Sequence, residues 1–208
     1  MMDESVVNFY SRKKEYRSLS NFWENDVTIV DGGETRIYQS GEHCFHGEKS
    51  RRISTVSEKD IRKLVLNDYS KSFLKPSVYA TPGEAKKAGG KRGLHLLSDE
   101  LKVWSQLSID VQKEICSWKI KNNETVKQDL LKSGTRLLVH PALMCSEEKL
   151  KDRIWEGRVL INERGELIIL GQNSLGNIWM DKRDEIVKKE RDAFIQNGLK
   201  MVSSVIYS

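Results

Sequence analysis

Apolar positions recur mostly every three to four residues along the chain, which is the period of helices that pack on one face. This spacing predicts helices over the following segments: 57–66, 82–88, 98–104, 109–121, 123–132, 147–154 and about 175–197. Shorter apolar or alternating runs between them are typical of strands: 6–10, 27–30, 35–38, 137–139, 158–162 and 166–170. We therefore expect an α+β fold, mostly helical with short strands, in a single domain over residues 1–208.

Turn and capping residues set the expected limits of several elements. Glycine-containing turns at 31–33 and 163–165 should join two strand pairs into hairpins. Ser57 and Asp60 form an S-x-x-D start for the helix that follows them. Its apolar positions, Ile61, Leu64 and Val65, support the helix.

The composition is that of a soluble globular protein, with 38% hydrophobic and 31% charged residues. No apolar run approaches the roughly 20 residues that cross a bilayer, and no secretory signal opens the sequence. We therefore expect an intracellular, cytoplasmic monomer that does not bind membranes, with a nuclear location left open. The net charge of +5 comes from 35 basic and 30 acidic residues, so it permits an anionic ligand without implying nonspecific duplex binding.

Cys44, Cys116 and Cys145 are odd in number, far apart in the sequence, and accompanied by no CxxC or HxxxH pattern. Reduced thiols are therefore expected rather than a disulfide framework or a zinc site. Apolar Phe45 follows Cys44, which favours a packed thiol over a nucleophile. We expect neither a metal nor a cofactor.

The most informative stretch is YQSGEHCFHGEK at 38–49, which contains two of the four histidines. On a helix, the spacing of Glu42, His46 and Lys49 places the three side chains along one stripe, as an acid and an amine in a shared site would require. The alternative is a helix N-terminus capped by Ser40, with Glu42 and Lys49 as solvated charges. The spacing alone is compatible with both interpretations.

Five tryptophans are many for this length, and their positions differ. Trp118 and Trp179 fall on apolar faces of predicted helices and are expected in the core. Trp104 and Trp155 stand at helix ends, where an indole can either pack or face a cleft and stack on a base or sugar. The segment GQNSLG at 171–176 lacks nucleotide-loop spacing, but its glycines and the following helix N-terminus suit an anion as well as a plain turn capped by Asn173 or Ser174.

Together these pieces resemble the NADAR family, also called YbiA-like proteins. The matching blocks lie in the family's order across roughly residues 8–183: NFYS at 8–11, LSNF at 19–22, GEHCFH at 41–46 with Lys49, EAKKAG at 84–89, Trp104, residues 152–155, and GQNSLG at 171–176 with Met180 and Arg183. Each block is short, and their ordered set carries the resemblance.

The resemblance implies a YbiA-like fold and an N-glycosidase that cleaves the bond between ribose C1 and an amine nitrogen without a metal. One branch of the family acts on phosphoribosylated pyrimidine intermediates of riboflavin biosynthesis, and another removes ADP-ribose from guanine in nucleic acids or nucleotides. By the resemblance, Glu42 is the functional glutamate, Lys49 the helical lysine, and Trp104 and Trp155 the active-site tryptophans. The matching blocks add candidates for substrate binding: Ser20, Asn21, Phe22, Gly41, His46, Asn173 and Arg183.

The sequence departs from the family pattern in two places. It reads Trp155-Glu156-Gly157-Arg158 where relatives commonly carry a further glycine or an aspartate after Trp-Gly, so Glu156 is a candidate replacement for the family aspartate. The hairpin at 158–170 is longer than the glycine-rich loop of the bacterial riboflavin-linked members. We therefore expect ADP-ribosylated guanine as substrate, with the riboflavin intermediates as the second hypothesis and a non-catalytic module that binds ADP-ribose or nucleotides as the third.

Two routes can cleave an N-ribosyl bond. In the first, a carboxylate stabilises an oxocarbenium-like transition state and activates water. In the second, the sugar ring opens to an imine, and a lysine exchanges with the departing amine to form a Schiff base that water hydrolyses. The spacing of Glu42 and Lys49 suits the second route, in which Glu42 moves protons and Lys49 must be partly neutral, through burial or through the nearby charges of Arg51 and Arg52.

Overall fold

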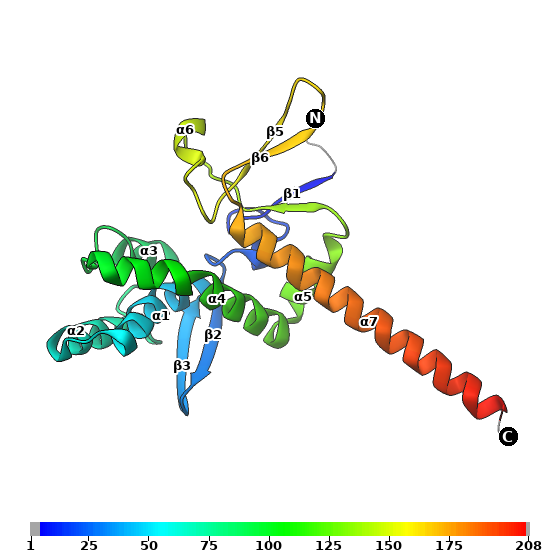
Figure 1. The fold of residues 1–208 in the computed structure, drawn as a ribbon, viewed down its shortest axis with the longest axis horizontal. Helices are drawn as coiled ribbons and strands as arrows, with labels where there is room; N and C mark the ends of the chain where they lie inside the picture. The colour runs from blue at the N-terminus through cyan, green and yellow to red at the C-terminus, as the bar shows by residue number, and fades with distance from the viewer. Residues whose placement is uncertain (1–4, 207–208) are drawn as a thin grey trace.

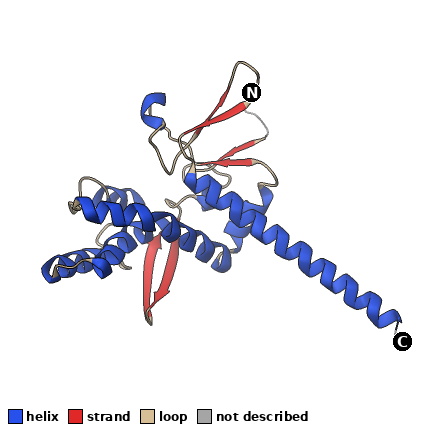
Figure 2. Cartoon of the chain, viewed as in Figure 1, coloured by secondary structure: helices blue, strands red, loops and turns tan. Residues whose placement is uncertain are grey.

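The protein folds into helices and three small sheets, as a computed structural model shows for residues 5–206, with side chains described to residue 197 (Figures 1 and 2). The helices are α1 (Gly41–Val56), α2 (Asp60–Lys71), α3 (Pro82–Gly89), α4 (Ser98–Asn122), α5 (Glu124–Lys132), α6 (Glu147–Leu150) and α7 (Ser174–Ile206), with a 3-10 turn, η1, at Arg17–Leu19. The expected α+β class is thereby confirmed. Among the helices of this described part, none is both long and apolar enough to span a membrane.

Each of the three sheets has two strands. The antiparallel hairpins are β2 (Glu24–Asp31) with β3 (Glu34–Ser40), and β5 (Arg158–Ile161) with β6 (Leu167–Leu170). The parallel pair joins β1 (Val6–Asn8) to β4 (Leu137–Val139), with Val7 opposite Leu138. Both hairpins form at the turns that the sequence predicts, and β3 leads directly into α1.

Several predicted helix limits are wrong. Residues 98–104 and 109–121 form one helix, α4, because no glycine or proline interrupts 98–122. Ser57 does not start α2; it ends α1 in an extended conformation, and α2 begins at Asp60. The apolar positions Ile61 and Leu64 of α2 are 79% and 63% exposed, and the buried apolar residue of this helix is Leu66.

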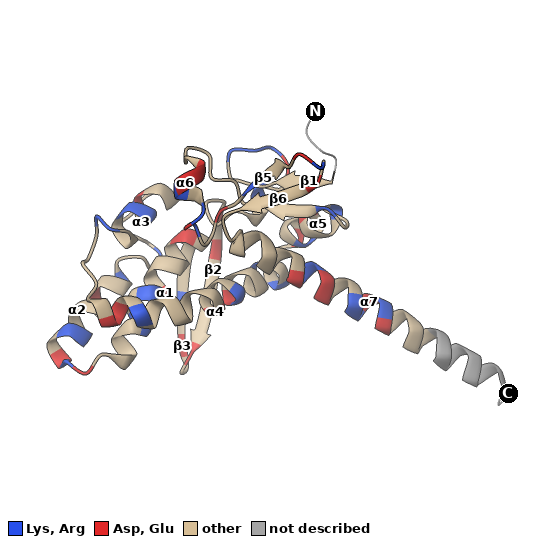
Figure 3. Ribbon diagram, turned by 45° about the horizontal axis from the view of Figure 1, so that its top comes forward, with Lys and Arg blue, Asp and Glu red and all other residues tan. Residues whose placement is uncertain are grey.

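The predictions for the last two helices were wrong in length. The helix expected over 147–154 is limited to the four residues of α6. The closing helix α7 ends at Ile206 rather than near residue 197, so the tail after Gly198 continues the helix. Figure 1 shows α7 leaving the body of the protein as a long rod, and Figure 3 shows acidic and basic residues mixed along it.

The apolar interior consists of two main clusters that meet beside α4. One packs α5, β4 and the start of α7 around Trp179, and the other packs the β2–β3 hairpin and α1 around Tyr38 and Phe45. The half-buried indole of Trp155 packs against both clusters. The junction between the clusters is therefore where a site can draw side chains from most of the fold.

A buried lysine holds the loop that crosses this junction. Lys119 of α4 is fully buried, and its Nζ donates to the carbonyl oxygen of Ser20 at 2.9 Å and lies 5.7 Å from the ring centroids of both Trp23 and Trp179. The indole of Trp179 donates to the neighbouring carbonyl oxygen of Leu19 at 2.9 Å. These contacts fix the backbone of residues 19–21 beside α1.

The Lys119 ammonium should give protein stability a pH dependence. Burial lowers the pKa of Lys119 to about 8, whereas the unfolded amine titrates near 10.5. Between these values the unfolded chain binds more protons, so the free energy of unfolding rises with pH there, by roughly 3 kcal/mol for this group. In urea unfolding at pH 7 and pH 10.5, Lys119→Met should therefore gain less stability with pH than the wild type does.

The matched control is Lys121→Met, an exposed lysine of the same helix, which should follow the wild-type curve at both pH values. Parallel curves for the wild type and Lys119→Met would show that the buried amine does not titrate between pH 7 and pH 10.5.

Candidate active site

The start of α1 is set by its cap and by a close backbone approach. The Oγ of Ser40 accepts a hydrogen bond from the backbone N–H of His43 at 3.3 Å, as the sequence predicts. A Cβ at Gly41 would lie 2.7 Å from Oδ1 of Asn21, so only glycine lets the 19–22 loop lie against this helix end. The N–H of Glu42 donates to the carbonyl oxygen of Asn21 at 3.0 Å, which joins the loop to the first turn of α1.

One stripe of α1 lines a cavity of about 260 Å³ at the junction of the two clusters. The stripe carries Glu42, Phe45, His46 and Lys49, in the spacing that the sequence predicts for one helical face. The rest of the lining comes from other parts of the chain: Asn21, Phe22, Lys86, Gly89, Gly90, Trp104, Gln112, His140, Trp155, Glu156 and Leu175. The cavity thus gathers residues from the 19–22 loop, α1, α3, α4, the 140–156 region and α7.

Glu42 is a buried carboxylate held in its ionised form. It is 8% exposed, and its Oε1 lies 3.2 Å from Nε2 of His46. Burial alone would raise the pKa of Glu42, but the hydrogen bond from His46 and nearby cationic groups, including Lys86, outweigh it and lower that pKa. Glu42 therefore enters a reaction as a proton acceptor.

His46 contacts Glu42 through Nε2 alone. Its Nδ1 is buried and has no hydrogen-bond partner among the described residues. A Cβ at Gly89 would lie 2.2 Å from this Nδ1, so the backbone of α3 covers it. His46 thus orients Glu42 through Nε2.

Lys49 lies two turns after Glu42 on the same stripe and is partly buried. Burial lowers its pKa to about 8, so roughly one molecule in ten carries a neutral amine at pH 7. Its Nζ donates to the carbonyl oxygen of Gly89. Arg51 and Arg52 do not lower the pKa, because both pair with Glu48 away from the cavity.

Aromatic rings form a large part of the wall. Phe45 meets Trp104 edge to face at 4.9 Å between centroids and meets Trp155 in the same way at 5.2 Å. Both indoles are half-buried and line the cavity while packing against the apolar clusters, so the two positions that the sequence allows are combined. Such rings suit a planar, polar ligand that stacks.

The structure divides the predicted site residues into two groups. Eight line the cavity: Asn21, Phe22, Glu42, His46, Lys49, Trp104, Trp155 and Glu156. The other four, Ser20, Gly41, Asn173 and Arg183, do not, and each has a different contact.

The contacts of Asn173 and Arg183 are supporting ones. The side chain of Asn173 accepts from the N–H of His140 at 3.0 Å and donates to the carbonyl oxygen of Leu138 at 2.8 Å. Arg183 donates to Oγ of Ser133 and to the carbonyl oxygen of Arg136, each at 2.8 Å. The carbonyl oxygen of Ser20 accepts a hydrogen bond from Lys119, and Gly41 lies against Asn21. These four residues therefore position the elements around the cavity without lining it.

Seven lining residues were not predicted as site residues from the sequence: Phe45, Lys86, Gly89, Gly90, Gln112, His140 and Leu175. The amide of Gln112 exchanges two hydrogen bonds with that of Asn21, at 2.7 and 3.1 Å. Lys86 lies 5.3 Å from the ring centroid of Phe22. The EAKKAG block was a signal for Lys86, but nothing local distinguishes Gln112 or His140 from other polar residues.

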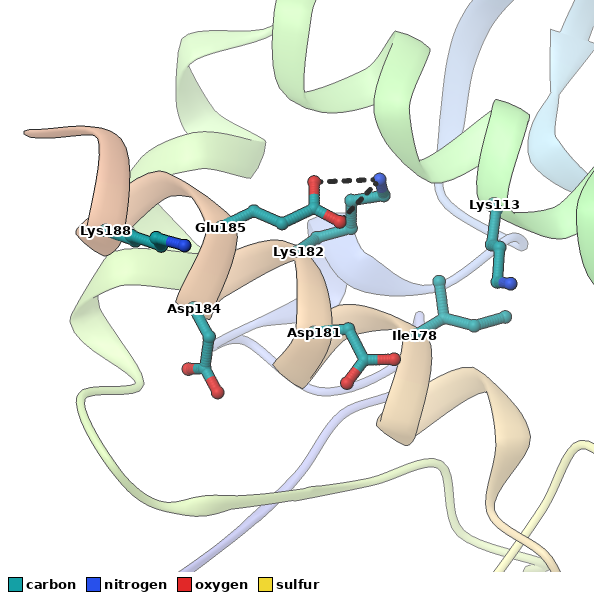
Figure 4. Close-up of a pocket in the computed structure, with 7 residues that line it drawn as sticks. All are labelled: Lys113, Ile178, Asp181, Lys182, Asp184, Glu185 and Lys188. Carbon is teal, nitrogen blue, oxygen red and sulfur yellow. Dashed lines mark hydrogen bonds and ion pairs between the residues drawn. The ribbon is translucent and has the colours of Figure 1, made fainter.

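A larger hollow of about 440 Å³ lies between α4 and α7 (Figure 4). Its lining is Lys113, Ile178, Asp181, Lys182, Asp184, Glu185 and Lys188, and Lys182 pairs with Glu185 at 3.0 Å. It has no aromatic wall, and the ion pair that it holds is formed on one helix. The 260 Å³ cavity is the better candidate despite its smaller volume.

A buried carboxylate, a partly neutral lysine and two tryptophans around one cavity define a site for nucleophilic and acid–base chemistry on an aromatic ligand. The chain belongs to the NADAR family, whose domain model matches residues 8–187. Membership of this family supports an N-glycosidase-like role.

The solution NMR structure of the Escherichia coli protein YbiA is similar in fold, with a TM-score of 0.54 and 19% identity over 91% of this chain and 89% of that one. A comparison with curated proteins found no match.

Proposed function

We propose that this protein is an N-glycosidase that removes ADP-ribose from ADP-ribosylated guanine in nucleic acid or nucleotides. The observation that carries the proposal is the convergence of Glu42 and Lys49 on one cavity between Trp104 and Trp155. At about 260 Å³ the cavity can enclose a ribose and part of a base, but is small beside typical pockets for whole ligands. This size favours a substrate that extends into solvent.

The chemistry follows from the states of the two groups on α1. When the ribose ring opens, the C1–O4′ bond breaks, the amine nitrogen forms a C1=N bond, and the proton of that nitrogen moves to O4′. The neutral amine of Lys49 then adds to C1, and Glu42 carries two protons in turn from the lysine nitrogen to the guanine nitrogen, which leaves as the free amine. Lys49 is then bound to C1 as a Schiff base, and water hydrolyses it to free ADP-ribose and the lysine amine.

Trp155 should clamp the base. Trp155→Ala removes one stacking face, so KM for the ribosylated guanine should rise about tenfold, since stacking is worth roughly 1–3 kcal/mol per base. Steady-state kinetics beside Trp118→Ala, an indole of α4 that packs on the core outside the cavity lining, separate this loss from general destabilisation. A KM for Trp155→Ala equal to that of the wild type would remove the clamp from the proposal.

Incubation with two substrates tests the function. We expect free ADP-ribose from ADP-ribosyl-guanine and little ribose phosphate from the phosphoribosylated pyrimidine intermediate of riboflavin biosynthesis. Rapid release of ribose phosphate alone would replace the substrate assignment with the riboflavin reaction. Binding of ADP-ribose in calorimetry, with neither product formed, would identify a non-catalytic module.

A further inference from the structure

The cavity is also lined by a titratable ring to which the proposed reaction assigns no role, that of His140. His140 directly follows β4. Its Nδ1 lies 3.3 Å from the carbonyl oxygen of Phe9. A carbonyl oxygen can only accept, so this nitrogen carries the hydrogen and Nε2 carries the lone pair in the neutral ring.

Three contacts hold the ring in place. Besides the bond to Phe9, the ring stacks on that of Phe9 at 5.4 Å with an interplanar angle of 29°. The backbone N–H of His140 donates to Oδ1 of Asn173, a buried residue in the left-handed conformation with φ of 49°. The left-handed backbone conformation of Asn173 costs free energy, and its hydrogen bonds to His140 and Leu138 hold it there, so that Asn173 fixes the end of β4.

The free nitrogen is open to the cavity. Nε2 makes no hydrogen bond to any described residue, and it is not fully enclosed: in the described part of the chain, only Nδ1 of His46 is both fully buried and without a partner. The charged groups that influence the ring are Glu156, Lys86 and Glu42. Burial lowers the pKa of His140, so Nε2 is an available acceptor at neutral pH.

We propose that His140 is a further catalytic residue, the general base that activates water in the second half of the reaction. This inference rests on the proposed function. Water adds to C1 of the Lys49 Schiff base, one proton moves from water to Nε2, and the C=N electron pair moves to the lysine nitrogen. Nε2 then gives the proton it took from water to the lysine nitrogen. As the C1–N bond breaks, Nε2 takes the proton of the new C1 hydroxyl and passes it to the released lysine amine. Glu42, which is hydrogen-bonded to Nε2 of His46, acts in the first half of the reaction, in which the Schiff base forms.

His140→Asn separates the two ring nitrogens, because the asparagine amide can still donate to Phe9 but offers nothing at the position of Nε2. The expected result is a fall in kcat of about a hundredfold at unchanged KM. The yield of the Lys49 adduct trapped by borohydride should rise, since the Schiff base forms and then waits for water. A purely structural role for His140 would lower the rate and the adduct together.

The matched control is His95→Asn, an exposed histidine outside the cavity, which should leave both readouts unchanged. If His140→Asn lowers the melting temperature, His140→Ala with added imidazole takes its place, and the imidazole should restore hydrolysis. A wild-type rate in His140→Asn, or loss of adduct in step with loss of rate, would overturn the role of His140.

The state of the ring can be tested without any substrate. ¹⁵N NMR of the wild type, with His140 assigned by its absence in His140→Asn, should show a neutral ring with hydrogen on Nδ1. Hydrogen on Nε2 would overturn the proposal even in an active enzyme. A wild type that releases nothing from ADP-ribosyl-guanine and forms no adduct would refute the proposed function, and the water-activating role would fall with it.

Discussion

Glu42→Gln is expected to lower the rate of ADP-ribose release about a thousandfold while ADP-ribose still binds. Glutamine has nearly the same shape and can still accept the hydrogen bond from Nε2 of His46, so the packing of α1 should survive. What it loses is the capacity to take up a proton at a buried position where the carboxylate is ionised. Single-turnover kinetics and calorimetric binding, measured on the same preparation, separate the two effects.

Glu58→Gln is the matched control, since Glu58 is exposed and lies outside the cavity. It should turn over at the wild-type rate. Full activity in Glu42→Gln would exclude proton transfer by Glu42 and would leave Glu156 as the carboxylate in the cavity that remains to be tested.

Lys49→Met is expected to abolish turnover, by a thousandfold or more, because it removes the nucleophile. Borohydride added during wild-type turnover should trap a covalent ADP-ribose adduct at Lys49, found by peptide mass spectrometry. The rate of adduct formation should rise with pH and level off above about pH 8, because only the neutral amine attacks and burial lowers the pKa of Lys49 to about 8.

Lys87→Met is a suitable comparison, as Lys87 is exposed on α3 beside the cavity without lining it. It should retain both the activity and the adduct. Absence of an adduct in the wild type, together with activity in Lys49→Met, would move the reaction to the oxocarbenium route, in which Glu42 alone assists water.

The parts of the site that lie on one element could be predicted from the sequence. Glu42, His46 and Lys49 are neighbours on one helical stripe, and helix geometry together with the Ser40 cap fixes their relation. Their burial could not be predicted in the same way. It depends on α3, where Gly89 allows the helix backbone to approach His46 and Lys49.

The contributions from distant segments had no comparable signal. His140 reaches the cavity only because β4 pairs with β1 and Asn173 fixes the end of that strand. Gln112 and Asn21 meet across 91 residues of sequence. Such pairings depend on the tertiary fold, which the period of apolar residues along the chain does not encode.

The errors in the fold have a similar origin. Ile61 and Leu64 have the spacing of one helical face, yet both are exposed on α2. The break placed between 104 and 109 is wrong because the residues between them, Ser105 to Ser108, include no helix breaker and continue α4. Polar character on a solvent-facing turn is compatible with a continuous helix.

The most direct measurement is a time course of ADP-ribosyl-guanine followed by proton NMR at the ribose C1 position, with the wild type and Glu42→Gln side by side. We expect the wild type to convert the substrate to free ADP-ribose and guanine, and Glu42→Gln to bind it without conversion. A wild type that binds the substrate and leaves its C1 signal unchanged would contradict an N-glycosidase and would make the cavity a binding site alone.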